Sequence, residues 1–207
     1  YNRRRFLKNS SAAFALASLG DYGLNLFFRE ERWRVGLIGC GWYGKSDLAR
    51  LMQVAQIDVV GLCDVDQNHI NEAVRLVQER QGSDASPYTY TDYRKMLDQH
   101  EFDLVIIGTP DHWHALNTID AIKAGAHVFV QKPTSADVIE SEAMLSYARK
   151  YNKTVQVGTQ RRSTPHLIEA KQKIVDQGLL GQIAHVDMCC YYHMRANGNP
   201  DVIPVPD

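Results

Sequence analysis

Three glycines at fixed spacing mark the most chemically informative part of this sequence. Residues 39–44 read Gly-Cys-Gly-Trp-Tyr-Gly, directly after a short apolar run and before leucines at helical spacing. Between a strand and a helix, Gly39 permits a tight turn, Gly41 lets a pyrophosphate approach the backbone, and Gly44 allows close helix packing. The N-terminus of the following helix supplies amide donors and positive potential. The pattern therefore predicts a dinucleotide-binding loop.

An acidic residue stands where such a loop needs one. Asp64 follows the apolar run at residues 57–63, and 64 − 44 = 20 residues separate it from the last glycine. At this spacing a carboxylate accepts hydrogen bonds from the adenosine ribose. It would repel a 2′-phosphate, and the following Val65, Asp66 and Gln67 include no arginine to offset that repulsion. We therefore expect NAD rather than NADP as the cofactor. The alternative to a dinucleotide site is a glycine turn that binds no nucleotide, with an ordinary aspartate at the end of the second strand.

The segments that must position these residues alternate between strand and helix patterns. Near-continuous Val/Ile runs are typical of a parallel sheet that is covered on both faces. Strands that alternate with helices indicate an α/β domain with a doubly wound parallel sheet, the NAD(P)-binding Rossmann class, which we expect over residues 31–162. Strands are expected at 34–39, 57–63, 103–108, 127–130 and 154–158, and helices after the glycine loop, around 70–77, and at 112–124 and 135–151.

Composition excludes several other classes of protein. The 207 residues are 44% hydrophobic and 23% charged, as in a globular protein with a core. A formal net charge of −1 gives no overall field that would gather nucleic acid or anionic lipid, so no nucleic-acid partner is expected. Four cysteines are too few for a disulfide scaffold. The potential metal ligands match no common zinc spacing, and we expect no metal; they are His112, His114, Cys189, Cys190 and His193.

The two ends of the sequence differ from the central domain. Residues 1–20 contain Arg3 and Arg4, then Phe-Leu-Lys and a short apolar run, which resembles a twin-arginine signal. The run is shorter than the roughly 20 apolar residues of a transmembrane anchor. We expect export to the periplasm, with a basic tail as the alternative. Residues 163–207 are expected to hold a linking helix at 165–176 and the first strand of an incomplete second domain, where Val186, Met188, Cys190 and Tyr192 alternate onto one face.

Three further motifs carry a family resemblance. Residues 108–114 read GTPDHWH, residues 124–133 read AGAHVFVQKP, and residues 157–163 read VGTQRRS. With the glycine loop, their order is similar to that of the Gfo/Idh/MocA family, from about Trp33 to the end. The resemblance implies a Rossmann domain and a C-terminal α/β domain whose open sheet forms the subunit interface, hence a homo-oligomer. It also implies NAD(P)-dependent dehydrogenases of sugars and polyols, and one branch that uses bound NAD for transient oxidation during glycoside cleavage.

The resemblance also implies roles for individual residues. The family's Glu-Lys-Pro motif is here Gln131-Lys132-Pro133, so Lys132 is expected to exchange a proton with a substrate hydroxyl while hydride leaves the same carbon. Gln131 departs from the usual glutamate, which puts the efficiency or type of chemistry in question. The further residues expected to border the cofactor are Trp42, Tyr43, Thr109, Pro110, His112, His114, Gln131 and Gln160. For His112, a capping or solvent-facing role is an equal alternative.

Three functions remain open at this point. The first is an NAD-dependent oxidoreductase acting on a secondary alcohol of a sugar or polyol. The second is an NAD-dependent glycosidase, which acts on a glycoside and regenerates its cofactor in place. The third is a truncated nucleotide-binding module without catalysis, because the substrate-binding half of the family is not among these residues. Net production of NADH separates the first from the second.

Overall fold

The computed structural model describes residues 32–82 and 84–189. The expected signal segment at residues 1–20 lies outside this range, as does the end of the last expected strand. Within the described residues, no helix is both long enough and apolar enough to cross a membrane.

Six parallel strands form a single sheet in the order β3-β2-β1-β4-β5-β6. The chain reverses direction across the sheet between β1 and β4, which is the switch point of a doubly wound fold. The expected α/β class is therefore confirmed. The elements are β1 (Trp33–Ile38), α3 (Trp42–Val54), β2 (Ile57–Cys63), α4 (Gln67–Gln81), β3 (Tyr88–Tyr90), α5 (Tyr93–Gln99), β4 (Leu104–Ile107), α6 (His114–Lys123), β5 (His127–Gln131), α7 (Val138–Lys150) and β6 (Val155–Gly158).

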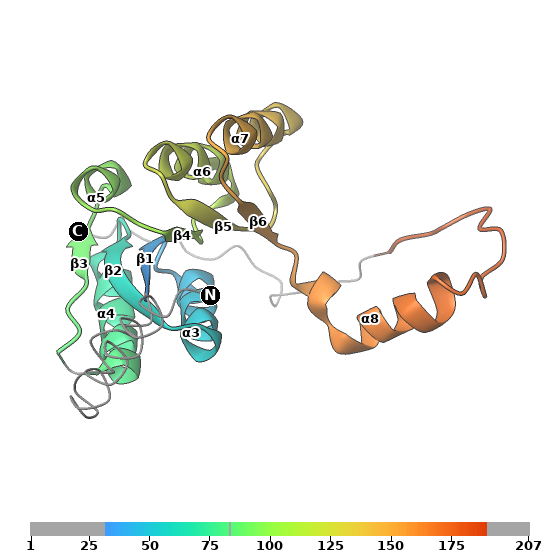
Figure 1. Cartoon of the computed structure of the whole chain (residues 1–207), viewed down its shortest axis with the longest axis horizontal. Helices are drawn as coiled ribbons and strands as arrows, with labels where there is room; N and C mark the ends of the chain where they lie inside the picture. Colours follow the sequence, from blue (N-terminus) through green and yellow to red (C-terminus); the bar gives the residue numbers. More distant parts are fainter. Residues whose placement is uncertain (1–31, 83, 190–207) are drawn as a thin grey trace, which may run out of the picture. The chain divides into compact units, whose positions relative to one another are not determined.

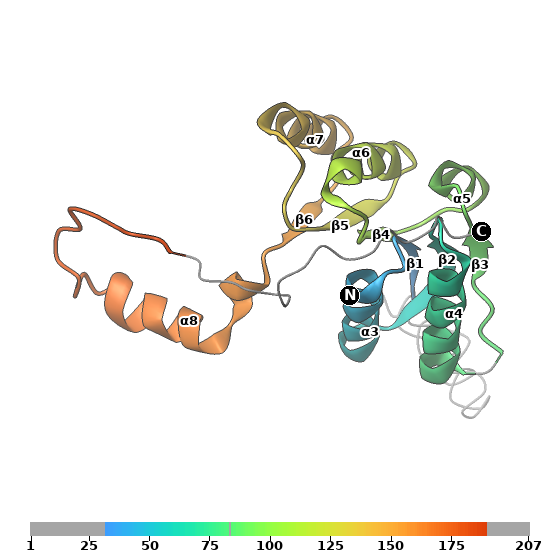
Figure 2. The ribbon, with the colours of Figure 1, turned by 180° about the vertical axis from the view of Figure 1, so that it is seen from behind.

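Helices cover both faces of the sheet (Figures 1 and 2). Helices α3 and α4 lie on one face, where Leu48 and Val77 pack against Leu37 of the central strand. Helices α5, α6 and α7 lie on the other, where Ile107 and Val130 are buried in a second cluster. Because successive strand residues point to opposite faces, both faces of the Val/Ile runs become core.

The helices differ in how their N-termini are capped. Asp66, Asp92 and Asp137 precede α4, α5 and α7, and each accepts a hydrogen bond from a backbone amide of its helix. Such caps satisfy the amides that a first turn leaves without intrahelical partners. Helix α3 instead begins after Gly41, which has no side chain to do this. Its N-terminus faces the site described below.

Three segments differ from the expectations. Two of them, strand β3 and helix α5, were not anticipated from the sequence. The helix expected at 165–176, in contrast, is confirmed as α8 (Pro165–Ala170) and a π-helical turn (Lys171–Val175). The strand expected from residue 186 is wrong over its described part, because residues 186–189 are irregular and exposed. A strand needs a neighbour for its backbone groups, and none of the described strands pairs with this segment.

Candidate functional site

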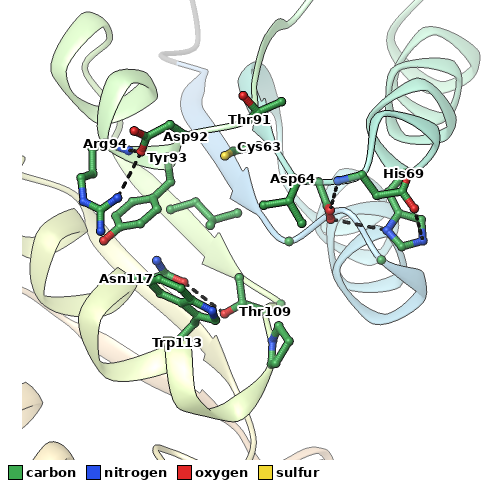
Figure 3. Close-up of a pocket in the computed structure, with 17 residues that line it drawn as sticks. Cys63, Asp64, His69, Thr91, Asp92, Tyr93, Arg94, Thr109, Trp113 and Asn117 are labelled. Carbon is green, nitrogen blue, oxygen red and sulfur yellow. Dashed lines mark hydrogen bonds and ion pairs between the residues drawn. The ribbon is translucent and has the colours of Figure 1, made fainter. Parts of the chain in front are cut away.

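A cavity of about 810 Å³ opens at the carboxyl ends of β1, β2, β3 and β4. Such a position, outside the strand ends at the switch point, is where open α/β sheets bind ligands. Figure 3 shows Asp64, Thr91 and Thr109 around it, from the ends of β2, β3 and β4. The predicted residues that line it are Gly39, Gly41, Asp64, Thr109 and Pro110.

The three glycines have distinct steric roles. Gly39 has φ +89, and a Cβ there would lie 2.6 Å from the backbone nitrogen of Thr109. A Cβ on Gly44 would lie 2.0 Å from the carbonyl oxygen of Gly39, so the helix and the loop touch through bare backbone. Gly41, by contrast, has nothing within 4 Å of its Cβ position. The loop is therefore packed tightly on the protein side and open on the cavity side, beside the uncapped N-terminus of α3.

Asp64 is fixed by the loops on both sides of it. Its Oδ2 accepts a hydrogen bond from the backbone nitrogen of Cys40 at 2.6 Å, and its Oδ1 accepts one from that of Asp66 at 2.9 Å. The imidazole Nδ1 of His69 lies 3.6 Å from Oδ2. Each carboxylate oxygen can accept a second hydrogen bond, so acceptor capacity remains for two ribose hydroxyls.

The cavity wall opposite Asp64 comes from the unanticipated segment. Arg94 places its guanidinium 4.7 Å from the centre of the Tyr93 ring and 3.4 Å from a carboxylate oxygen of Asp92 (Figure 3). The Tyr93 hydroxyl donates to Asp120 at 2.9 Å, and burial together with this hydrogen bond raises the pKa of Tyr93 to about 12. Thr91 lines the same wall. The turn residues that cap α5 were the only sequence signal for this wall.

The buried side chain of His114 connects the turn after β4 with the turn after β5. It is 1% exposed, and its Nδ1 lies 2.7 Å from the carbonyl oxygen of Pro133 while its Nε2 lies 2.9 Å from that of Thr109. It does not line the cavity. His114 thus holds the turn after β4 against the turn after β5.

The Gln-Lys-Pro segment lies at the end of β5. Gln131 is 4% exposed, and its amide contacts Asp47 on α3. Its Oε1 accepts from the backbone nitrogen of Lys132 at 3.2 Å and from Nε2 of Gln160 at 3.0 Å. Lys132 itself is exposed, on a turn at the same edge of the sheet as the cavity, and its peptide bond to Pro133 is cis.

The remaining predicted residues are not gathered around the first cavity. Trp42 is 76% exposed and packs edge-on against Tyr43, with ring centres 5.0 Å apart. His112 is exposed in the short turn before α6. Gln160 lines a second cavity of about 780 Å³, between α3 and the strands β4 to β6.

Cys40 in the glycine loop and Cys63 at the end of β2 offer no reactive thiolate at the site. Cys40 and Cys63 are both buried, and Sγ of Cys40 lies 3.5 Å from the carbonyl oxygen of Cys63. Burial raises the pKa of the Cys40 thiol far above its usual range and that of Cys63 to about 12. Across residues 32–82 and 84–189, no three His, Cys, Asp or Glu side chains are grouped as metal ligands.

Comparisons with known proteins agree with this geometry. Residues 33–159 match the model of an oxidoreductase family with an NAD-binding Rossmann fold. The α-N-acetylgalactosaminidase of Shewanella oneidensis is 28% identical over 196 residues, which is 90% of this chain and 41% of that protein. A glycosyl hydrolase family 109 protein of Shewanella sp. (strain ANA-3) is 28% identical over 80% of this chain and 36% of its own length.

Solved structures give the same picture. Myo-inositol 2-dehydrogenase from Lactobacillus plantarum superposes with a TM-score of 0.63 and 31% identity, over 74% of this chain and 43% of that one. Scyllo-inositol dehydrogenase from Lactobacillus casei, with bound NAD(H) and scyllo-inositol, gives 0.63 and 25%, over 73% and 43%. The chain spans less than half the length of these relatives.

Proposed function

We propose a function from the family of this chain, which belongs to the Gfo/Idh/MocA oxidoreductases with an NAD-binding Rossmann fold. The proposed activity is a dehydrogenase reaction, in which hydride is transferred from a secondary alcohol carbon of a sugar or polyol to NAD. The observation that carries this proposal is the shared sheet edge: the cavity lined by the glycine loop and Asp64 opens at the carboxyl ends of β1 to β4, and Lys132 follows the carboxyl end of the neighbouring strand β5. One edge of the sheet thus holds both a nucleotide site and a proton-exchanging group.

The residues of the cavity fit NAD. The open side of Gly41 and the uncapped amides of α3 suit a pyrophosphate, and the remaining acceptor positions of Asp64 suit ribose hydroxyls. A 2′-phosphate would meet the Asp64 carboxylate, and Arg94 in the opposite wall is already paired with Asp92. When bound, NAD supplies the hydride acceptor.

Lys132 performs the proton step of this proposal. As the substrate carbon loses its hydride, the O–H bond breaks and its proton passes to the neutral amine at Nζ of Lys132, leaving a carbonyl group. In the reverse direction the ammonium returns that proton. His114 and Gln131 hold the turn, so the lysine is presented from a fixed backbone.

A second candidate is supported by the curated relatives. The α-N-acetylgalactosaminidase and the family 109 hydrolase suggest a glycoside as substrate. In this version the sugar is oxidised, the glycosidic bond is cleaved with release of the aglycone as an alcohol and addition of water in its place, and the sugar is reduced again with no net change in NAD. NAD binding and the oxidation assigned to Lys132 are common to both functions, and the overall stoichiometry in NADH separates them.

The test uses the full-length natural protein with NAD. Inositols, free sugars and nitrophenyl glycosides are assayed both for NADH absorbance and for released nitrophenol. NADH formed in proportion to substrate supports the dehydrogenase, and nitrophenol released without net NADH supports the glycosidase. Lys132→Met should lower either activity by at least about 100-fold. The control variant Lys150→Met, on the exposed side of α7, should leave both activities unchanged. Activity retained in Lys132→Met would overturn the assignment.

Export and assembly are further parts of the proposal. The Arg3-Arg4 pair and its apolar run suggest twin-arginine export, which Arg3→Lys/Arg4→Lys should block in a fractionation of periplasm and cytoplasm. The family resemblance suggests a homo-oligomer, and light scattering of the full-length protein measures its mass.

A further inference from the structure

A partly buried hydrogen-bond network joins the nucleotide-binding helix to the lysine turn. Asp47 lies in the second turn of α3 and Gln131 is the last residue of β5, 84 positions away. The Nε2 of Gln131 donates to Oδ2 of Asp47, while its Oε1 accepts from the backbone nitrogen of Lys132 at 3.2 Å. Gln160 donates to the same Oε1 at 3.0 Å. One amide therefore links three separate elements.

We propose that Asp47 and Gln131 act as one positioning unit for Lys132. In this unit Asp47 supplies a carboxylate, and the hydrogen bond from Gln131 holds that carboxylate near the lysine turn. This inference rests on the proposed function of Lys132. The resemblance described above places a glutamate at position 131, next to the lysine. In this chain the negative charge comes instead from α3, one hydrogen bond further away.

The chemistry of an amide explains why position 131 is a glutamine. Its oxygen must accept from the backbone of Lys132 and from Gln160, so only its nitrogen can face Asp47, and it must meet an acceptor there. A glutamate would satisfy the first two donors but would set one carboxylate against another. Like charges at this range disfavour ionisation of one of the pair. Gln131 is thus matched to Asp47.

The backbone beside Gln131 is shaped to hold it. Gly158 is the register partner of Gln131 on β6. A Cβ at Gly158 would lie 2.9 Å from Nε2, 3.1 Å from Cδ and 3.2 Å from Oε1 of Gln131. The amide plane therefore lies flat against a bare backbone, and any side chain at position 158 would displace it.

The surroundings of Asp47 act on its carboxyl group in both directions. Burial is the largest influence and raises the pKa of the Asp47 carboxyl above its ordinary value of 3.8, while the hydrogen bond from Gln131 and the nearby charge of Arg50 offset part of that rise. Arg162 lines the same cavity from the segment after β6. The hydrogen bond from Gln131 and the charge of Arg50 thus offset part of the cost of burying the Asp47 carboxylate.

A charge-swap cycle in the full-length protein tests the unit. The variants are Asp47→Asn, Gln131→Glu and the double variant, in which the carboxylate introduced on β5 can accept a hydrogen bond from the amide introduced on α3. We expect Gln131→Glu to lower the thermal midpoint by several degrees, and the double variant to recover most of that loss. Additive effects of the two changes would overturn the coupling.

A second readout reports on Lys132 without any substrate. Lys132 is acetylated with acetic anhydride, and peptide mass spectrometry measures the ratio of its acetylation rate to that of Lys150. This ratio should rise severalfold in Asp47→Asn and return toward the wild-type value in the double variant. Gly158→Ala should change the ratio while leaving both charges in place. A constant ratio in all variants would overturn the positioning role. If the ratios change but Lys132→Met keeps full activity, the unit stands and the proposed function fails.

Discussion

The Oδ2 atom of Asp64 lies 2.6 Å from the backbone nitrogen of Cys40. This hydrogen bond joins the end of β2 to the middle of the glycine loop after β1. The group expected to bind ribose and the loop expected to bind pyrophosphate are therefore parts of one rigid unit, and a change in one should be felt by the other.

Asp64→Asn should weaken NAD binding by about 10-fold or more, because the amide keeps the shape but loses the charge and one acceptor. Isothermal titration of the full-length protein measures this. Asp98→Asn, on the exposed side of α5, is the matched control. Equal NAD affinity in Asp64→Asn and the control would show that Asp64 does not contact the cofactor.

The glycine loop gives a matched pair of alanine variants. Gly44→Ala brings its Cβ within 2.0 Å of a carbonyl oxygen, so we expect a loss of at least about 3 kcal/mol of stability, or no folding. Gly41→Ala meets open space, so it should fold normally and bind NAD at least several-fold more weakly. Thermal unfolding with and without NAD separates the two effects. Equal destabilisation by both changes would contradict the steric roles assigned above.

His114→Ala should cost about 2–4 kcal/mol in the free energy of unfolding, because it removes a buried ring whose nitrogens lie within hydrogen-bond distance of the carbonyl oxygens of Thr109 and Pro133. Urea denaturation is the measurement. His112→Ala, at an exposed position two residues away, should change stability by less than about 0.5 kcal/mol. A small effect at His114 would mean that the two turns hold together without it.

The pH dependence of stability should include a contribution from Asp103. Hydrogen bonds from the Arg34 side chain hold the pKa of Asp103 below its ordinary value of 3.8. A carboxyl with a depressed folded-state pKa stabilises the fold above its unfolded pKa, and this stability disappears as the pH falls through the folded one. Asp103→Asn should therefore lose about 1 kcal/mol or less near pH 7 and almost nothing in strong acid. Urea midpoints at both pH values test this, and a loss that persists in acid would exclude an ionic cause.

The parts of the fold that could be predicted are those written in contiguous residues. The glycine loop, Asp64 and the Val/Ile runs each carry their information locally, and their order along the chain indicates the doubly wound sheet. Strand β3 spans only Tyr88–Tyr90 and α5 only Tyr93–Gln99, too short for either periodicity to emerge. The cavity wall that they form was missed for that reason.

Long-range contacts were beyond the sequence pattern. The pairing of Asp47 with Gln131 depends on the distance between helix α3 and strand β5 in the folded domain. Likewise, nothing in the local sequence indicates that the His114 ring joins the turns after β4 and β5. The irregular backbone of residues 186–189 shows the opposite limit, since alternation of apolar residues does not make a strand where no other described strand adjoins it.

The place of β1 at the centre of the sheet sets an order of events during synthesis. Its first neighbour, β2, leaves the ribosome soon after it, but its second, β4, begins much later: 69 positions separate Arg34 from its partner Asp103. At about 5–20 residues per second, that interval lasts roughly 3–14 seconds. Throughout it, β1 presents an unpaired edge to other nascent chains and to chaperones.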